Sequence, residues 1–194
     1  ISIEQTSSEI TAKYKASLVS GKKIIDCTGG FGIDDYYFAQ HFESVVHCEI
    51  NPELSKIVTH NIKQLKAENI RCILGNSSDV LANLNQQFDC IYIDPSRRND
   101  AKGKVFMLKD CLPNVVDLQD FYFDFSDIIL IKTAPILDLQ AGLTELKNVV
   151  SIHIIAVENE VKELVWKIEK NHTESPKIFA INIEKEQTVS TEIS

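Results

Sequence analysis

Residues 24–39 constrain the fold of this chain more than any other segment. Residues 24–27 (Ile-Ile-Asp-Cys) form a short apolar run typical of a strand, and residues 28–32 (Thr-Gly-Gly-Phe-Gly) form a turn that leads into helix-compatible residues. Three glycines in four positions allow the backbone to approach a ligand closely, and the amides at the start of the following helix favour a negatively charged group. This order of strand, glycine turn and helix predicts a binding site for a nucleotide-like cofactor.

Strands and helices alternate along the chain. We expect strands at residues 23–27, 44–50, 70–74, 88–94, 127–133, 149–157 and 177–183, and helices near residues 9–19, 33–42, 52–65, 78–84 and 160–170. The middle strands are apolar nearly throughout, which favours an α/β fold with a mostly parallel sheet and helices on both faces. Ligands of such sheets bind beyond the carboxyl ends of the strands, which selects the glycine turn, Glu49, Asn76 and residues 94–98.

Length and composition favour one domain. With 194 residues, 44% of them hydrophobic, we expect a single domain over residues 1–194, with a helical extension at 1–20 and a polar tail at 184–194. The chain begins with Ile rather than Met, which indicates a fragment of a longer protein. No apolar run reaches the ~20 residues that a membrane helix needs, and no signal-peptide pattern is present, so we expect a soluble protein.

The spacing of cysteines and histidines bears on the cellular location of the protein and on metal binding. The five cysteines show no C-x-x-C spacing, which indicates reduced thiols and a cytoplasmic protein. The five histidines show no ligand spacing, so we assign no metal. The net charge of −8 does not indicate a polyanionic partner, but a local basic patch or a further domain can still bind one.

Glu49 refines the cofactor prediction. It lies 17 residues beyond Gly32, about where an acid reaches ribose hydroxyls across the first two strands. The dinucleotide pattern G-x-G-x-x-G fits poorly, because Asp35 stands where a small third residue is needed and would crowd the helix and repel a pyrophosphate. A phosphate-free cofactor such as S-adenosylmethionine suits the turn better. The alternatives are a turn without function and a solvated surface acid at Glu49.

Four segments resemble successive motifs of the class I S-adenosylmethionine-dependent methyltransferases: IIDCTGGFG, HCEINPEL, ILGNSSD and FDCIYIDPSRR, within residues 20–183. The DPSRR form is similar to bacterial THUMP-like-domain methyltransferases, which are RNA methyltransferase candidates. The resemblance implies a Rossmann-like, seven-stranded sheet with its last strand antiparallel. It places Asp26, Gly30 and Gly32 around the methionine part, Glu49 on the ribose and Asn76 near the adenine. The remaining cofactor-binding candidates are Thr28, Gly29, Phe31, Ile50, Ser77 and Asp94.

The DPSRR segment carries the candidate chemistry. Asp94 ends a buried strand and Pro95 fixes the backbone, so a carboxylate and neighbouring carbonyls can align a nucleobase amine with the methyl group. Ser96 stands where the relatives have a second proline, and Arg97 where amine methyltransferases place a stacking aromatic. The catalytic candidates are Asp94, Pro95 and Ser96, and the substrate-binding candidates are Arg97, Arg98 and Lys132. The alternative is a solvated charged loop.

The resulting prediction is a methyltransferase that uses S-adenosylmethionine and acts on a nucleobase in RNA, at an amine nitrogen, without metal or membrane. Two alternatives remain: a non-catalytic RNA- or protein-binding module of the same fold, and an NAD-dependent oxidoreductase. DNA, protein or a small molecule stays open as the acceptor, and the oligomeric state is not indicated.

Overall fold

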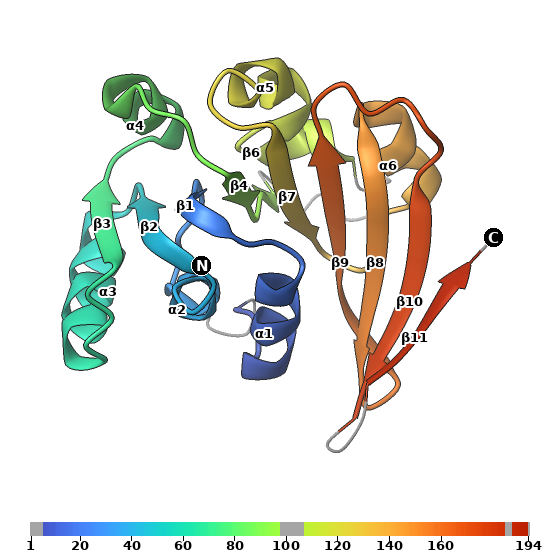
Figure 1. Cartoon of the computed structure of the whole chain (residues 1–194), viewed down its shortest axis with the longest axis horizontal. Helices are drawn as coiled ribbons and strands as arrows, with labels where there is room; N and C mark the ends of the chain where they lie inside the picture. Colours follow the sequence, from blue (N-terminus) through green and yellow to red (C-terminus); the bar gives the residue numbers. More distant parts are fainter. Residues whose placement is uncertain (1–5, 98–106, 185–187, 194) are drawn as a thin grey trace. The chain divides into compact units, whose positions relative to one another are not determined.

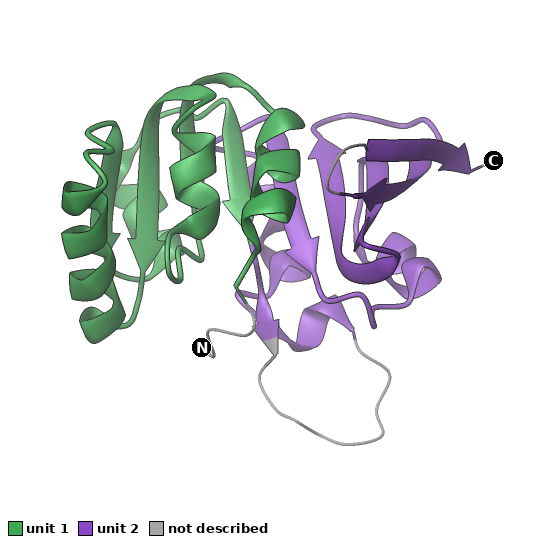
Figure 2. Ribbon diagram, turned by 90° about the horizontal axis from the view of Figure 1, so that it is seen from below, with its two compact units in different colours: residues 1–93 green, residues 94–194 purple. Residues whose placement is uncertain are grey.

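The computed structural model describes residues 6–97, 107–184 and 188–193. The chain divides into two compact units, residues 1–93 and residues 94–194, here called unit 1 and unit 2 (Figure 2). No helix of the described residues is long and apolar enough to cross a membrane.

Unit 1 is a parallel α/β unit. Its four strands are β1 (Gly21–Asp26), β2 (Phe42–Glu49), β3 (Ile70–Leu74) and β4 (Cys90–Ile93), in the order β4-β1-β2-β3 (Figure 1). Its helices are α1 (Glu9–Ser17), α2 (Ile33–Phe38), α3 (Pro52–Gln64) and α4 (Ser77–Leu84). Ile24 pairs with Val45 on one side and Cys90 on the other, and all three side chains are buried. The predicted parallel arrangement is confirmed for these four strands.

Helix caps explain where the helices of unit 1 begin. Asn51 accepts hydrogen bonds from the amides of Glu53 and Leu54 at 3.0 and 3.1 Å, and Pro52 opens α3. The Ser8 hydroxyl caps α1 by accepting from the Thr11 amide at 3.2 Å. The helical spacing of Ile10, Tyr14 and Leu18 predicts the apolar face of α1. The buried residues are instead Thr11, Ala12, Lys15 and Ala16.

Unit 2 is built mainly from antiparallel pairs. Its long strands are β7 (Ile128–Thr133), β8 (Val149–Val157), β9 (Glu160–Glu169), β10 (Lys177–Ile183) and β11 (Thr188–Ile193), in the order β11-β10-β8-β9-β7. Only β8 and β10 among these form a parallel pair. Two short strands, β5 (Ser96–Arg97) and β6 (Cys111–Leu112), form a separate pair. The helical segments are η2 (Leu108–Asp110), α5 (Val115–Tyr122) and α6 (Leu139–Glu145).

The prediction of a helix at residues 160–170 is wrong, because this segment forms β9. Glu158 and Asn159 have φ angles of 50° and 65°, which is the backbone of a two-residue hairpin turn. The turn returns the chain along β8, and β9 pairs with both β7 and β8. Strand pairing on both edges therefore outweighs a helical spacing of apolar residues that also fits a strand buried on both faces.

The main sheet has nine strands rather than the expected seven: four in unit 1 and five in unit 2. The additional strands are β9, which was expected as a helix, and β11, which was expected as a polar tail. Residues of β11 are exposed throughout, but Ser190 pairs with Ile181 of β10 in an antiparallel ladder. Reversal is not confined to the last strand, since β9 is antiparallel to both of its neighbours.

Candidate functional site

The glycine turn joins β1 to α2 in a conformation that depends on glycine. Gly30 has φ 55° and Gly32 has φ 73°, both in the left-handed region that other residues avoid. The Gly32 amide donates to the Gly29 carbonyl at 2.9 Å and closes the turn. The segment of residues 28–32 is called the glycine loop below.

Glu49 is tied to the glycine loop. Its Oε2 accepts a hydrogen bond from the Gly30 amide at 3.0 Å, and its Oε1 accepts one from the Asn51 amide at 2.7 Å. Only 5% of Glu49 is exposed, so it is not a solvated surface acid. A carboxylate oxygen can accept a second hydrogen bond, which leaves Glu49 able to receive two hydroxyl groups.

Asp26 lies at the end of β1 and is almost fully buried. One carboxylate oxygen accepts from the Thr28 amide at 2.7 Å and from the Thr28 hydroxyl at 3.0 Å. Burial raises the pKa of Asp26 well above its ordinary value, and the nearby Asp35 charge adds to the effect. The Thr28 hydrogen bonds oppose the shift only in part.

The remaining predicted cofactor contacts surround the ends of β2 and β3. The Gly75 amide donates to the Glu49 carbonyl at 3.0 Å, which holds the turn after β3 beside Glu49. Asn76 caps α4 by accepting from the Ser78 amide at 2.9 Å, and Ser77 is buried. Ile50 is 68% exposed and Phe31 is half-buried.

A buried carboxylate–imidazole pair lies behind the glycine loop. Asp35 Oδ2 and His47 Nδ1 are 2.6 Å apart, and neither side chain has any exposed surface. The Asp35 carboxylate is directed at His47, so this pair occupies the position where a dinucleotide-binding turn has a small residue. Spacing between histidines gave no sign of this pair. The signal in the sequence is an acid at the small-residue position of the turn.

A second buried network joins α1 to the start of α2. Asp34 accepts from the hydroxyls of Ser7 and Tyr92, both at 2.8 Å, and forms an ion pair with Lys15 at 3.2 Å. Lys15 is completely buried and also donates to Ser7 at 2.7 Å. Asp34 follows the glycine loop by two residues and Tyr92 lies on β4, so the network fixes the loop's helix against the sheet.

The buried groups of unit 1 predict that stability falls as pH rises. The pKa of His47 is raised: burial lowers it, but the charge and hydrogen bond of Asp35, with Glu49, outweigh burial. A raised histidine pKa stabilises the fold fully below about pH 6.5 and ceases to do so as pH rises through the folded value. The raised pKa of Asp26 acts in the same direction above about pH 4.

We therefore expect the melting temperature to fall by about 2–8 °C between pH 6 and pH 8.5. Calorimetry across this range measures it. Asp26→Asn should flatten the profile, whereas the exposed Asp117→Asn should leave it unchanged. A melting temperature that rises with pH would contradict the assigned directions.

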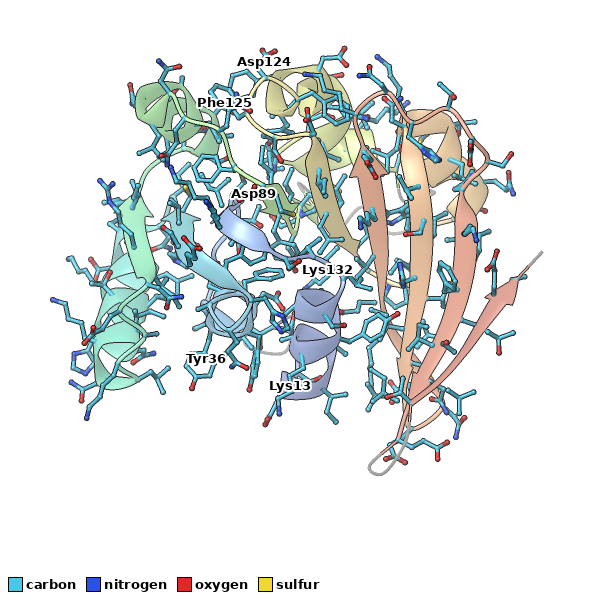
Figure 3. All side chains as sticks on the ribbon, viewed as in Figure 1. Lys13, Tyr36, Asp89, Asp124, Phe125 and Lys132 are labelled. Carbon is cyan, nitrogen blue, oxygen red and sulfur yellow. The ribbon has the colours of Figure 1, made fainter. Side chains whose placement is uncertain are left out.

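Asp94, the first residue of unit 2, follows β4 directly in the chain and forms an ion pair with Lys132. Lys132 Nζ lies 2.6 Å from Asp94 Oδ2, and the two side chains are 9% and 36% exposed. Lys132 comes from β7, where it is labelled in Figure 3. Its neighbour Thr133 accepts from the buried Trp166 indole at 3.0 Å, which anchors this end of β7.

The rest of the DPSRR segment is described in part. Pro95 is buried, and Ser96 is exposed with its hydroxyl 3.5 Å from the Leu112 carbonyl. The backbone of Arg97 pairs with Cys111 in the β5–β6 ladder. Arg98 lies outside the described residues. The described residues of this segment are thus held in a small ladder after Asp94 rather than in an unstructured loop.

Two further features concern possible ligands. Within residues 6–97, 107–184 and 188–193, no group of three or more His, Cys, Asp or Glu side chains could hold a metal ion. A groove of about 330 Å³ runs along α3 beside β3, and it contains two lysines and a histidine. Its lining residues are Pro52, Ser55, Lys56, Thr59, His60, Lys63 and Leu74.

Known proteins resemble this chain in part of the sequence and in the fold. A family model described as RNA cap guanine-N2 methyltransferase matches residues 21–97, which include the glycine loop, Glu49 and Asp94. No curated protein matches the chain. A presumed methyltransferase from Porphyromonas gingivalis is similar in structure, with a TM-score of 0.87 and 29% identity over 99% of this chain and 49% of that one. The chain thus spans about half the length of that protein.

Two other solved structures share the fold at lower identity. A tRNA m1G37 methyltransferase of M. jannaschii has a TM-score of 0.61 and 15% identity, over 87% of this chain and 51% of that one. A presumed methyltransferase from Streptococcus mutans in complex with SAH has a TM-score of 0.58 and 12% identity, over 84% and 98% of the two chains. The chain has the α/β fold of these methyltransferases.

Proposed function

We propose that this chain is the catalytic part of an S-adenosylmethionine-dependent methyltransferase that acts on a nucleobase amine in RNA. The observation that carries the proposal is the buried Glu49 carboxylate, hydrogen-bonded to the glycine loop at Gly30 and to the start of α3 at Asn51. A carboxylate so placed suits a ribose with two free hydroxyls.

The residues of unit 1 suit the charges of the cofactor. The glycine loop can approach a ligand without side-chain obstruction, and Asp26 lies at its start for the positively charged amino group. Glu49 would take the ribose, and the Asn76 turn would take the adenine. The bound cofactor supplies a methyl group on a sulfonium, which is a good leaving group.

Asp94 and Lys132 would position the acceptor amine. The ion pair with Lys132 fixes the orientation of the Asp94 carboxylate, which can then accept a hydrogen bond from the amine. The amine lone pair forms the new carbon–nitrogen bond while the carbon–sulfur bond breaks and its electrons stay on sulfur. The proton released from nitrogen passes to Asp94 or to water. The chain's residues therefore contribute mainly alignment.

RNA as the acceptor is supported by two kinds of observation. The matching family model is described as acting on the RNA cap, and the M. jannaschii neighbour is a tRNA methyltransferase. Locally, the groove beside α3 offers Lys56, His60 and Lys63, so a chain of net charge −8 still presents basic groups to a phosphate backbone.

Transfer of tritium from labelled S-adenosylmethionine to bulk RNA tests the function. We expect label in the RNA fraction. Ribonuclease should release this label, and the Asp94→Ala variant should not produce it. Binding of S-adenosylhomocysteine without transfer to RNA, DNA or protein would indicate a non-catalytic module instead. Transfer to protein alone would contradict the RNA assignment while leaving the methyltransferase assignment in place.

A further inference from the structure

His47 and the glycine loop are in direct contact. A Cβ atom on Gly29 would overlap the His47 imidazole, lying 2.6 Å from Nε2. Gly29 does not have a left-handed φ, unlike Gly30 and Gly32, so glycine is needed here for space alone. The imidazole is therefore the surface on which the first glycine of the loop rests.

His47 and Glu49 act on adjacent residues of the loop. They are two residues apart on β2, so their side chains leave the same face of the strand. His47 contacts Gly29, and Glu49 accepts the hydrogen bond of the Gly30 amide. His47 thus limits how closely the loop can approach β2 at Gly29, and Glu49, the proposed ribose-binding residue, binds the loop at the next residue.

Asp35 holds the imidazole through Nδ1. It lies in the first turn of α2, and its 2.6 Å contact with Nδ1 fixes the plane of the ring. Dinucleotide-binding turns bring helix and strand together through a small residue at this position. Here the space between α2 and β2 is filled by the Asp35–His47 pair, which gives the loop a different support.

The pair also carries unsatisfied polar atoms. Among the described residues, His47 Nε2 and Asp35 Oδ1 are buried without a hydrogen-bond partner. Unpaired buried polar atoms are rare in native proteins and cost stability, so their presence in this pair requires an explanation. The carboxylates that act on the imidazole are Asp35 and Glu49, and Asp34 lies close to Asp35.

We propose that His47, oriented by Asp35, is a positioning residue that sets the conformation of the glycine loop for cofactor binding. The proposal rests on the proposed function of the loop. It assigns the imidazole an effect on cofactor affinity through Gly29, not a contact with the reacting atoms.

A double-mutant cycle between Gly29 and His47 tests this assignment, with S-adenosylhomocysteine as the probe in calorimetry on the folded protein. Gly29→Ala and His47→Ala should each raise the dissociation constant by about tenfold. The double variant should lose no more than the worse single one, because the new methyl group then occupies space that the imidazole left. A roughly hundredfold loss in the double variant, as independent effects predict, would overturn the proposal.

Two further variants separate positioning from general stability. His47→Gln retains an amide that can reach Asp35 and should recover part of the affinity lost in His47→Ala. His153→Gln is the matched control, since His153 is also buried and hydrogen-bonded, to Ser151 at 3.1 Å. It should leave the dissociation constant unchanged. An equal loss in this control would overturn the proposal.

The same cycle measured by urea unfolding separates failure of the proposal from failure of the proposed function. Coupling in the free energy of unfolding, together with no probe binding by the wild-type chain, would show that the contact exists but that the loop does not bind this cofactor. Probe binding with additive effects would leave the cofactor assignment in place and remove the role of His47.

Discussion

Replacement of Glu49 with alanine should weaken binding of S-adenosylhomocysteine by at least about 100-fold. The variant loses the acceptor for two ribose hydroxyls, and it also releases the Gly30 and Asn51 amides that the carboxylate now holds at 3.0 and 2.7 Å. Both losses act on the same ligand, because the first removes a contact and the second frees the loop. Isothermal titration calorimetry measures the effect.

Two variants control for indirect effects of this change. Glu49→Gln keeps the size of the side chain and one acceptor oxygen, so it should lose less affinity than alanine. Glu53 lies four residues after Glu49, is exposed, and pairs with Lys56 at 2.9 Å. Glu53→Ala should therefore not change the affinity for the cofactor. Wild-type affinity in Glu49→Ala would remove this residue from the cofactor site.

Replacement of Asp94 with alanine should lower the rate of methyl transfer by about 10²- to 10⁴-fold while the dissociation constant of the cofactor changes less than about threefold. Its carboxylate accepts the hydrogen bond from the acceptor amine in the proposed reaction, and the proposed cofactor contacts lie mainly on residues of unit 1. Single-turnover transfer of label measures the rate, and calorimetry measures the affinity.

The ion pair with Lys132 complicates the alanine variant, since it leaves a mostly buried ammonium group without its carboxylate. Asp94→Asn keeps a neutral oxygen near Lys132 Nζ and should destabilise the fold less than Asp94→Ala. It should still transfer the methyl group slowly. Asp127→Asn is the matched control, because Asp127 is exposed and its pair with Lys170 is 3.9 Å long. Retained activity in both Asp94 variants would exclude this residue from the reaction.

Local patterns predicted the parts of the site that depend on neighbouring residues in the chain. The strand, glycine turn and helix from β1 to α2 follow from residues 24–39, and the cap of α3 follows from Asn51 and Pro52. The meeting of Glu49 with the glycine loop could also be expected, because adjacent parallel strands bring their carboxyl ends to one edge.

Contacts between distant residues could not be predicted in the same way. The Asp35–His47 pair joins a helix to a neighbouring strand, and the Lys15–Asp34 pair joins two helices. Neither has a spacing that marks it in one sequence. Each also follows a general rule that only the folded structure can reveal, since charged side chains are seldom fully buried unless they are paired.

The strands of unit 2 show a second limit. The apolar residues of β9 recur at a spacing that suits a helix, and only the pairing of β9 with β7 and β8 decides for a strand. Strand β11 is mostly polar and is exposed, so its sequence does not mark it as a strand. Its extended conformation is instead held by the antiparallel ladder with β10.

Calorimetric titration of the chain with S-adenosylhomocysteine, and in parallel with NAD, tests whether the glycine loop and Glu49 form a site for S-adenosylmethionine. We expect saturable binding of S-adenosylhomocysteine that Glu49→Ala weakens, and no binding of NAD. Binding of NAD but not of S-adenosylhomocysteine would contradict it.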